Sequence, residues 1–331
     1  MSTIRQVAEL AQVSTATVSR ALRGSPSVTS ETRRRVEEAA RQLDYVLPFI
    51  PSSLASGRTN TVGVVTPYLA RWYFGTAISA IEEVVHRSNL DTVLYTLGSH
   101  EIRQRFFDNM PLRKRVDAVI VVSIPLAELE VRALRRLGVP LGLVGLDIDG
   151  FNSVRIDDHQ GGWAAAKHLV ECGHRRIGLV SGLRGEPFRF DAPMSRRAGF
   201  LDALRDSGLE MWDGMEADGA FTVEGGEAAM EALLRLPEPP TAVFAMSDEM
   251  AFGALRALRL RGLSVPRDMA LMGFDDHDLA AAVDLTTIAQ PTAAQGQAAA
   301  EAVIAQLGGA QPRQQVFSTT LVVRASTIQA G

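Results

Sequence analysis

Residues 3–45 read TIRQVAELAQVSTATVSRALRGSPSVTSETRRRVEEAARQLDY, and this stretch determines the fold of the N-terminal part of the chain. Its apolar residues recur at the i, i+3, i+4 and i+7 spacing of one helix face, which predicts a first helix over residues 4–11. Thr3 and Gln6 stand where a capping box would begin that helix. The same spacing recurs further along the stretch, and Thr29 is the expected N-cap of this later helix.

Between these two helices, a further helix is predicted over residues 14–22, with Ser14 as its N-cap and Val18 and Leu22 facing inward. Its outward face carries Thr15, Ala16, Ser19 and Arg20. Two short helices joined by a tight turn, the second with such a face, have the geometry that enters a DNA major groove. An arginine there could pair with a guanine edge. Any small three-helix bundle shows a comparable spacing, so spacing alone leaves a purely structural role open.

The order of the residues favours DNA binding more strongly than their spacing does. Residues 3–45 resemble, almost position for position, the N-terminal module of the lactose repressor and galactose repressor (LacI/GalR) family. This resemblance implies that Thr15, Ala16 and Arg20 read operator bases. It also implies that a set of hydroxyl side chains caps helices or donates to phosphates: Thr3, Ser14, Thr17, Ser19 and Thr29.

A segment rich in proline, serine and glycine follows, with the sequence VLPFIPSSLASGRTN at residues 46–60. It has the composition of a linker, and the resemblance implies a hinge helix whose Leu54 wedges into the minor groove at the operator centre. Pro51 departs from the family pattern and either starts a shortened helix or prevents one. Ser52 stands where the family usually has an arginine. The expected domains are residues 1–46 (helix-turn-helix), 47–60 (hinge) and 61–331 (effector binding and dimerisation).

The composition of the 331 residues, with 46% hydrophobic and 22% charged, is that of a globular protein. The net charge is −4, but residues 1–60 carry eight arginines against five acidic residues. A basic N-terminal segment (residues 1–60, the head) followed by an acidic remainder (residues 61–331, the body) favours contact between the head and a polyanion. Cys172 is the only cysteine, which excludes an internal disulfide. With no secretory signal or apolar span, we expect a cytoplasmic, nucleoid-associated protein without a membrane partner.

From Val62 onward, β-rich runs alternate with helix-length segments, which predicts parallel sheets covered on both faces and divided into two α/β lobes. The β-rich runs are VGVVTP, TVLYTL, VDAVIVVS, VPLGLVGL, RRIGLVSG, TAVFAMS and MALMGFDD. The body is similar to the periplasmic-binding-protein type I fold, with a cleft between the lobes. By that resemblance the N-lobe takes about 61–160 and 291–319, and the C-lobe about 161–290 and 320–331.

Ligands of open α/β sheets bind where strands end, so residues just after the predicted strands are candidates for effector binding. The first strand is followed by YLARWYF, in which Trp72, Tyr73 and Phe74 could face a sugar ring or pack the next helix. The family pattern at this point has Asp, Asn and Pro where this chain has Tyr68, Arg71 and Trp72. Arg71 is a further candidate for effector contact, and the class of ligand stays open.

Later elements match cleft positions of the family more closely. MSRRAGF places Arg196 at the cleft arginine that binds ligand oxygens, and MGFDD places Asp275 as the carboxylate that accepts from a ligand. Asp248 could equally be a helix N-cap. The remaining candidates for lining the cleft or joining the lobes are Phe221, Ser247, Asp248 and Gln290. A carboxylate, an arginine and aromatic rings together suit a polyhydroxylated ligand.

The sequence predicts a homodimeric transcription factor, a repressor, that binds a near-palindromic double-stranded operator and is controlled by a small effector, with sugar as the expected class. A purine or another metabolite stays open, as do an enzyme fused to a DNA-binding head and a sensor without DNA binding. Asp275–Asp278 with Asp157–His159 could suggest a metal site, but adjacent loop residues cannot all turn to one ion. No catalytic motif or cofactor fingerprint is present, so we expect no enzyme and no cofactor.

Overall fold

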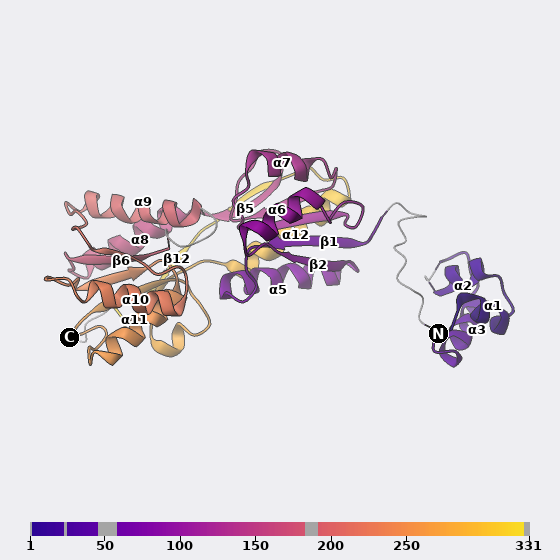
Figure 1. The fold of residues 1–331 in the computed structure, drawn as a ribbon, viewed down its shortest axis with the longest axis horizontal. Coiled ribbons are helices and arrows are strands. Elements are labelled where there is room, and N and C mark those ends of the chain that lie inside the picture. Colours follow the sequence, from indigo (N-terminus) through magenta and orange to yellow (C-terminus); the bar gives the residue numbers. More distant parts are fainter. Residues whose placement is uncertain (1, 23–24, 46–57, 183–190, 328–331) are drawn as a thin grey trace. The chain divides into compact units, whose positions relative to one another are not determined.

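The computed structural model describes residues 2–22, 25–45, 58–182 and 191–327, and its internal contacts divide the chain into two units, residues 1–59 and 60–331 (Figure 1). The hinge residues Pro51, Ser52 and Leu54 lie outside the described residues. No helix in the described part of the chain is both long enough and apolar enough to cross a bilayer.

The first unit is a bundle of α1 (Ile4–Ala11), α2 (Thr15–Leu22) and α3 (Ser30–Gln42). The predicted capping box is confirmed: the Thr3 N–H donates to Gln6 Oε1 at 2.8 Å, and the Gln6 N–H donates to Thr3 Oγ1 at 3.4 Å. Each helix supplies one fully buried valine to the core, namely Val7, Val18 and Val36. With so small a core, local caps matter to the stability of these short helices.

The second unit contains two lobes, each with a six-stranded sheet covered by helices on both faces (Figure 1). All strand pairs of the N-lobe sheet are parallel, in the order β11-β5-β4-β3-β1-β2. The strands are β1 (Thr61–Thr66), β2 (Asp91–Thr96), β3 (Ala118–Val122), β4 (Leu141–Val144), β5 (Asn152–Ile156) and β11 (Gln314–Phe317). Helices α5 (Trp72–Arg87) and α12 (Thr292–Leu307) pack on one face, and α6 (His100–Asn109) and α7 (Glu128–Arg135) pack on the other.

The C-lobe sheet has the order β12-β10-β9-β8-β6-β7, and only the β10–β12 pair is antiparallel among its described strands. These strands are β6 (Ile177–Ser181), β7 (Glu216–Asp218), β8 (Ala242–Ala245), β9 (Ala270–Asp275), β10 (Thr286–Ala289) and β12 (Thr320–Val322). The helices are α8 (Asp158–Glu171), α9 (Asp191–Asp206), α10 (Val223–Leu233) and α11 (Asp248–Leu260), with the short 3₁₀ turn η1 (Ala281–Val283).

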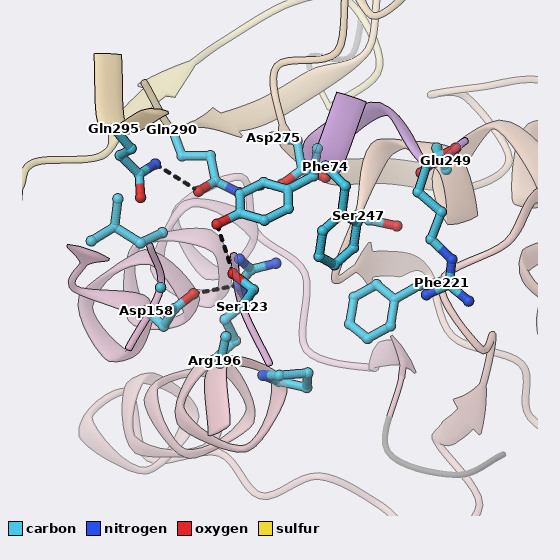
Figure 2. A pocket seen from close by; sticks show the side chains of 16 residues that line it. Phe74, Ser123, Asp158, Arg196, Phe221, Ser247, Glu249, Asp275, Gln290 and Gln295 are labelled. Carbon is cyan, nitrogen blue, oxygen red and sulfur yellow. Dashed lines mark hydrogen bonds and ion pairs between the residues drawn. The ribbon is translucent and has the colours of Figure 1, made fainter. Parts of the chain in front are cut away.

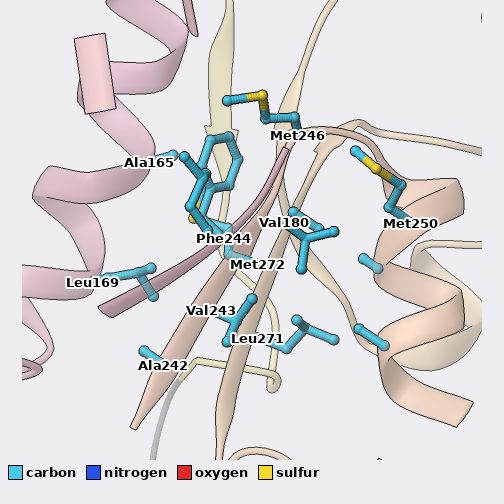
Figure 3. Packing of buried hydrophobic residues seen from close by; sticks show 14 of the residues in the cluster. Ala165, Leu169, Val180, Ala242, Val243, Phe244, Met246, Met250, Leu271 and Met272 are labelled. Atoms are coloured by element: carbon cyan, nitrogen blue, oxygen red, sulfur yellow. The ribbon is translucent and has the colours of Figure 1, made fainter. Parts of the chain in front are cut away.

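The core of the C-lobe explains why its strands are nearly continuous apolar runs. Alternate residues of a strand point to opposite faces, and both faces are covered here by helices. In Figure 3, Ala165 and Leu169 approach the sheet from α8, while Met250 approaches from α11. Phe244 and Val243, neighbours on the central strand β8, are both fully buried. The two-lobed fold with parallel sheets predicted from the alternating pattern is therefore confirmed, although the short strands β5, β7, β10 and β11 were not predicted.

The chain passes between the lobes three times, between β5 and α8, between β10 and α12, and between β11 and β12. Helices α8 and α9 approach so closely that only glycine fits at their contact. A Cβ on Gly199 would lie 1.9 Å from the His159 carbonyl oxygen, and a Cβ on Gly162 would lie 2.0 Å from the Arg196 carbonyl oxygen. This close contact fixes the position of Arg196 on α9 relative to the start of α8.

Candidate functional site

The outward face of α2 is as the sequence predicted. Thr15, Ala16 and Arg20 are exposed, and Ser19 is half-buried. Arg20 Nε donates to the Ala16 carbonyl oxygen at 3.3 Å, which leaves the terminal guanidinium nitrogens available to another acceptor. Short side chains near the start of the helix allow its backbone to approach a nucleic acid closely, and the arginine supplies a bidentate donor.

Three of the five predicted hydroxyl side chains, Thr3, Ser14 and Thr29, act as helix caps. Ser14 Oγ accepts from the Thr17 N–H at 3.1 Å and lies 2.9 Å from Thr17 Oγ1, and Thr29 Oγ1 accepts from the Thr32 N–H at 3.3 Å. These caps satisfy backbone N–H groups that have no partner within the first turn. Thr3 has the same role at α1. Leu54, the predicted minor-groove wedge, lies outside the described residues.

A pocket of about 700 Å³, including the part open to solvent, lies between the lobes (Figure 2). This volume is in the range of small-molecule sites. The lining residues are Arg71, Tyr73, Phe74, Ser123, Gly145, Ile156, Asp158, Ala192, Pro193, Arg196, Phe221, Ser247, Glu249, Asp275, Gln290 and Gln295. Many of them follow the carboxyl ends of parallel strands, where the rule for open α/β sheets places ligands.

Arg196 is held in the pocket by partners on three sides. Its Nε donates to Asp158 Oδ1 at 2.7 Å, its Nη1 donates to the Met246 carbonyl oxygen at 2.8 Å, and its guanidinium carbon lies 3.6 Å from the centre of the Phe274 ring. The arginine is 7% exposed. Such a fixed, paired guanidinium offers its remaining N–H groups to a ligand without further loss of side-chain entropy.

Asp275 is buried at the end of β9 and belongs to a chain of amides. Gln295 Nε2 donates to Gln290 Oε1 at 3.2 Å, and Gln290 Nε2 donates to Asp275 Oδ1 at 2.6 Å. Burial raises the pKa of Asp275 to about 7, although Arg196 and the bond from Gln290 lower it. Its φ of +119° is rare for a residue other than glycine, and such strain is often stored at functional sites. Asp275 therefore presents a hydrogen-bonding carboxyl group to the pocket.

Aromatic side chains line the pocket from both lobes. Tyr73 and Phe74 of α5 pack edge to face with their centroids 5.1 Å apart, and the Tyr73 hydroxyl lies 3.0 Å from Ser123 Oγ. Burial raises the pKa of Tyr73 to about 12, so the phenol stays protonated. Phe221 has a φ of +52° and packs so closely on Gly182 that a Cβ there would lie 2.0 Å from its ring. These rings give the pocket flat apolar surfaces beside the polar groups.

Trp72 does not line the pocket between the lobes. Its side chain lies outside the lining, where Nε1 donates to Asp278 Oδ2 at 3.2 Å and the indole packs against His277 with centroids 5.1 Å apart. Trp72 begins α5, and its neighbour along the helix, Tyr73, turns into the pocket instead. The tryptophan thus joins the N-lobe to the loop after β9 in the C-lobe.

Asp248 does not line the pocket either. Its Oδ1 accepts from Thr287 Oγ1 at 2.8 Å, and its Oδ2 accepts from the His277 N–H at 2.8 Å. The alternative role as an N-cap is also wrong, because Ser247 caps α11 by accepting from the Met250 N–H at 3.3 Å. Burial raises the pKa of Asp248 well above its usual range. Asp248 fixes the loop that follows Asp275.

Sequence reasoning missed four polar lining residues, Ser123, Asp158, Glu249 and Gln295. Ser123 and Asp158 follow the strands β3 and β5, so a search of every strand end would have found them once β5 was recognised. Glu249 is close to the predicted Ser247 in the chain. Gln295 has no such signal, because it reaches the pocket only through the crossover from β10 to α12.

The two segments that could suggest a metal site, Asp275–Asp278 and Asp157–His159, form hydrogen bonds and ion pairs with other residues of the protein. Asp276 Oδ1 accepts from Arg324 Nη2 at 2.7 Å, and His159 Nε2 lies 2.8 Å from Asp202 Oδ2. Asp157 caps α8 by accepting from the Gln160 N–H at 2.9 Å. Among the described residues, no three His, Cys, Asp or Glu side chains are grouped to hold a metal ion.

Comparison with known proteins accounts for both units. Residues 3–47 match the family described as "Bacterial regulatory proteins, lacI family", and residues 166–327 match the "Periplasmic binding protein-like domain". Catabolite control protein A of Priestia megaterium is 35% identical over 294 residues, 87% of each chain. The HTH-type transcriptional repressor CytR of Escherichia coli is 32% identical over 336 residues, 98% of this chain and 96% of its own.

Solved structures show the same similarity. The Lac repressor dimer bound to operator and the anti-inducer ONPF gives a TM-score of 0.85 at 27% identity and covers 99% of both chains. The transcriptional regulator CelR in complex with cellobiose gives a TM-score of 0.72 at 32% identity and covers 98% of this chain and 100% of its own. The chain therefore belongs to the lacI family of bacterial regulatory proteins and is a DNA-binding transcriptional regulator.

Proposed function

We propose that this regulator is a repressor that binds a near-palindromic operator as a homodimer and responds to a saccharide in the pocket between its lobes. The observation that carries the effector class is the arrangement of a fixed arginine, Arg196, and a buried carboxyl group, Asp275, beside the rings of Tyr73 and Phe221. Ring hydroxyls need paired donors and acceptors, while the C–H face of a sugar needs a flat apolar surface. The similarity to CelR, solved with cellobiose, supports the same class.

Coupling between effector and operator follows from the architecture. Residues 1–46 would bind the operator half-site, residues 47–60 would act as the hinge, and residues 61–331 would bind effector and form the dimer. A dimer with twofold symmetry matches a site with the same symmetry. An effector that favours one arrangement of the lobes alters how well both heads reach their half-sites, and DNA must alter effector affinity by the same factor.

The protein is further proposed to act in the cytoplasm and to bind its effector without converting it. A regulator of operator DNA acts in the cytoplasm at the nucleoid, and a ligand-sensing pocket needs no turnover. The relatives are transcriptional regulators, which supports a role without catalysis. Incubating the protein with each effector that binds, and recovering it chemically unchanged, is the expected result. Conversion of a bound compound would instead point to an enzyme fused to a DNA-binding head.

The effector is identified by thermal unfolding against a panel of mono- and oligosaccharides, nucleobases and nucleosides. A ligand at about 100 times its Kd adds about 2.7 kcal/mol to the free energy of unfolding, which gives a clear rise in Tm. Stabilisation by a saccharide supports the proposal. Stabilisation by nucleobases or nucleosides alone would replace it with a purine- or pyrimidine-responsive regulator.

Arg20→Ala is expected to weaken operator binding about 5- to 150-fold, because the loss of one arginine–base contact costs about 1–3 kcal/mol. Affinity for random DNA should fall much less. The measurement is binding to operator and to random duplexes at one fixed salt concentration. Arg259→Ala, at an exposed position of α11, is the matched control because it removes the same charge from the body. An unchanged preference of the Arg20 variant for operator would exclude base reading by this residue.

A further inference from the structure

The charges of the ionisable side chains that line the pocket do not sum to zero. Its lining holds three carboxyl groups, Asp158, Glu249 and Asp275, and two guanidinium groups, Arg71 and Arg196. In Figure 2, Asp158 lies at one end of the pocket and Glu249 at the other. When all five groups are ionised, the lining carries one net negative charge.

Each of the two arginines is already engaged with the protein. Arg196 pairs with Asp158 at 2.7 Å and donates to a backbone carbonyl oxygen. The Arg71 guanidinium carbon lies 3.8 Å from the centre of the Tyr68 ring and is attracted electrostatically to Glu249. An anionic ligand would therefore have to compete with a carboxylate of the protein for each guanidinium.

Glu249 also occupies the position that an anion would otherwise take at the start of α5. It is the second residue of α11 in the C-lobe, and its carboxylate accepts from the backbone N–H of Trp72, the first residue of α5 in the N-lobe. The N-cap of α5, Arg71, makes no side-chain cap bond to this helix. Helix N-termini attract anions through unpaired N–H groups and the helix dipole, and here a protein carboxylate fills that role.

We infer that the pocket selects a neutral effector over its anionic counterparts, and that Glu249 is the residue that sets this selectivity. Sugar acids, sugar phosphates and nucleotides are the excluded classes, whereas neutral polyhydroxylated compounds are accepted. The inference rests on the proposed function, since it concerns the effector of the same pocket. Coulomb repulsion between a ligand anion and the net negative charge of this partly buried lining is large enough for at least about tenfold discrimination.

The test uses the full chain and matched ligand pairs at pH 8 and fixed salt. The pairs are glucose with glucuronate, glucose with glucose 6-phosphate, cellobiose with cellobionate, and cytidine with its 5′-monophosphate. Calorimetric titration is expected to show that the neutral member of a binding pair binds at least about tenfold more tightly than the anionic one. Equal or tighter binding of the anionic member overturns the inference and leaves the proposed effector pocket intact. No binding by any member overturns the proposed saccharide pocket itself, and this inference with it.

Substitution of Glu249 tests whether the charge of this residue, rather than the size of the ligand, causes the selectivity. Glu249→Gln keeps the length and an acceptor oxygen but removes the charge, so the ratio of the anionic to the neutral Kd should shift by about tenfold in favour of the anionic member. Glu224→Gln is the matched control, because Glu224 is the second residue of α10 and is exposed outside the pocket. Adding Arg71→Gln to Glu249→Gln should cancel this shift, since Arg71 is the cation that the first change releases. An unchanged ratio of the two Kd values in Glu249→Gln, with unchanged circular dichroism, overturns the assignment to Glu249.

Discussion

Replacing Arg196 with alanine is expected to lower the free energy of unfolding of the body by roughly 3–5 kcal/mol, because removal of one partner of a buried ion pair leaves the other charge without compensation. The Arg196 and Asp158 side chains retain only 8% and 14% of their accessible surface. The Arg196 variant also loses the contact of the guanidinium with the Phe274 ring and the bond to the Met246 carbonyl oxygen. Urea unfolding followed by circular dichroism measures the change, and effector titration of the folded variant should show no binding.

The neighbouring arginine provides the control for this change. Arg197 pairs with Glu216 outside the pocket, and its side chain is 35% exposed. Arg197→Ala should therefore cost only about 1 kcal/mol or less and leave effector binding intact. The double variant Asp158→Ala/Arg196→Ala should recover part of the stability lost in Arg196→Ala, because the buried carboxylate goes with its partner. A single Arg196 variant as stable as the Arg197 variant would contradict a paired, buried role for Arg196.

The parts of the molecule that depend on local sequence were predictable. The first helix begins and ends where its apolar spacing and the Thr3 cap placed it, because a capping box and a helical period are set by residues within one or two turns. The long strands and the division into parallel sheets followed from alternation with helices. The strand β7 contains only three residues, too few for a periodic pattern, and it forms only by pairing with β6.

The pocket lining was predicted only in part, since a strand end indicates which loop borders the pocket but not which of its residues face inward. Successive residues at a helix start differ by about 100° in direction. Ser247 is the extended N-cap of α11, and it lines the pocket together with Glu249, while Asp248 between them turns into the lobe and bonds Thr287. The bond from Gln295 to Gln290 likewise depends on a tertiary crossover. Such contacts arise from the packing of two lobes and leave no spacing signal in the sequence.

Asp275→Asn is expected to weaken effector binding about 100-fold, because a carboxylate accepts hydroxyl donors about twice as strongly as a neutral acceptor and the change replaces one of its two acceptor oxygens with an NH₂ donor. The asparagine can still accept from Gln290 through Oδ1, so the fold is retained. Effector titration measures the loss. Operator affinity without effector should stay within a few-fold of the wild type, since Asp275 lies in the second unit and outside the helix-turn-helix module.

The same substitution should change how stability depends on pH. The folded-state pKa of Asp275 is about 7, raised by burial above its ordinary value of 3.8. A raised pKa means that the folded state holds the proton more tightly, so this contribution to stability is present in full below pH 3.8 and is lost as pH rises through 7. Between pH 5 and pH 8 the wild type should lose on the order of 2 kcal/mol that the asparagine variant keeps.

Urea unfolding of both proteins at several pH values tests this difference, which includes the part of the raised Asp248 pKa that comes from the charge of Asp275. Asp276→Asn is the matched control, because Asp276 is the next residue, bonds Arg324 and does not line the pocket. It should keep both the effector response and the pH profile of the wild type. If Asp275→Asn instead kept its response to effector, the ligand would contact other residues, and the assignment of the pocket carboxylate would be wrong. If the response were lost but the pH profile stayed that of the wild type, Asp275 would bind effector as a carboxylate that is ionised throughout this range.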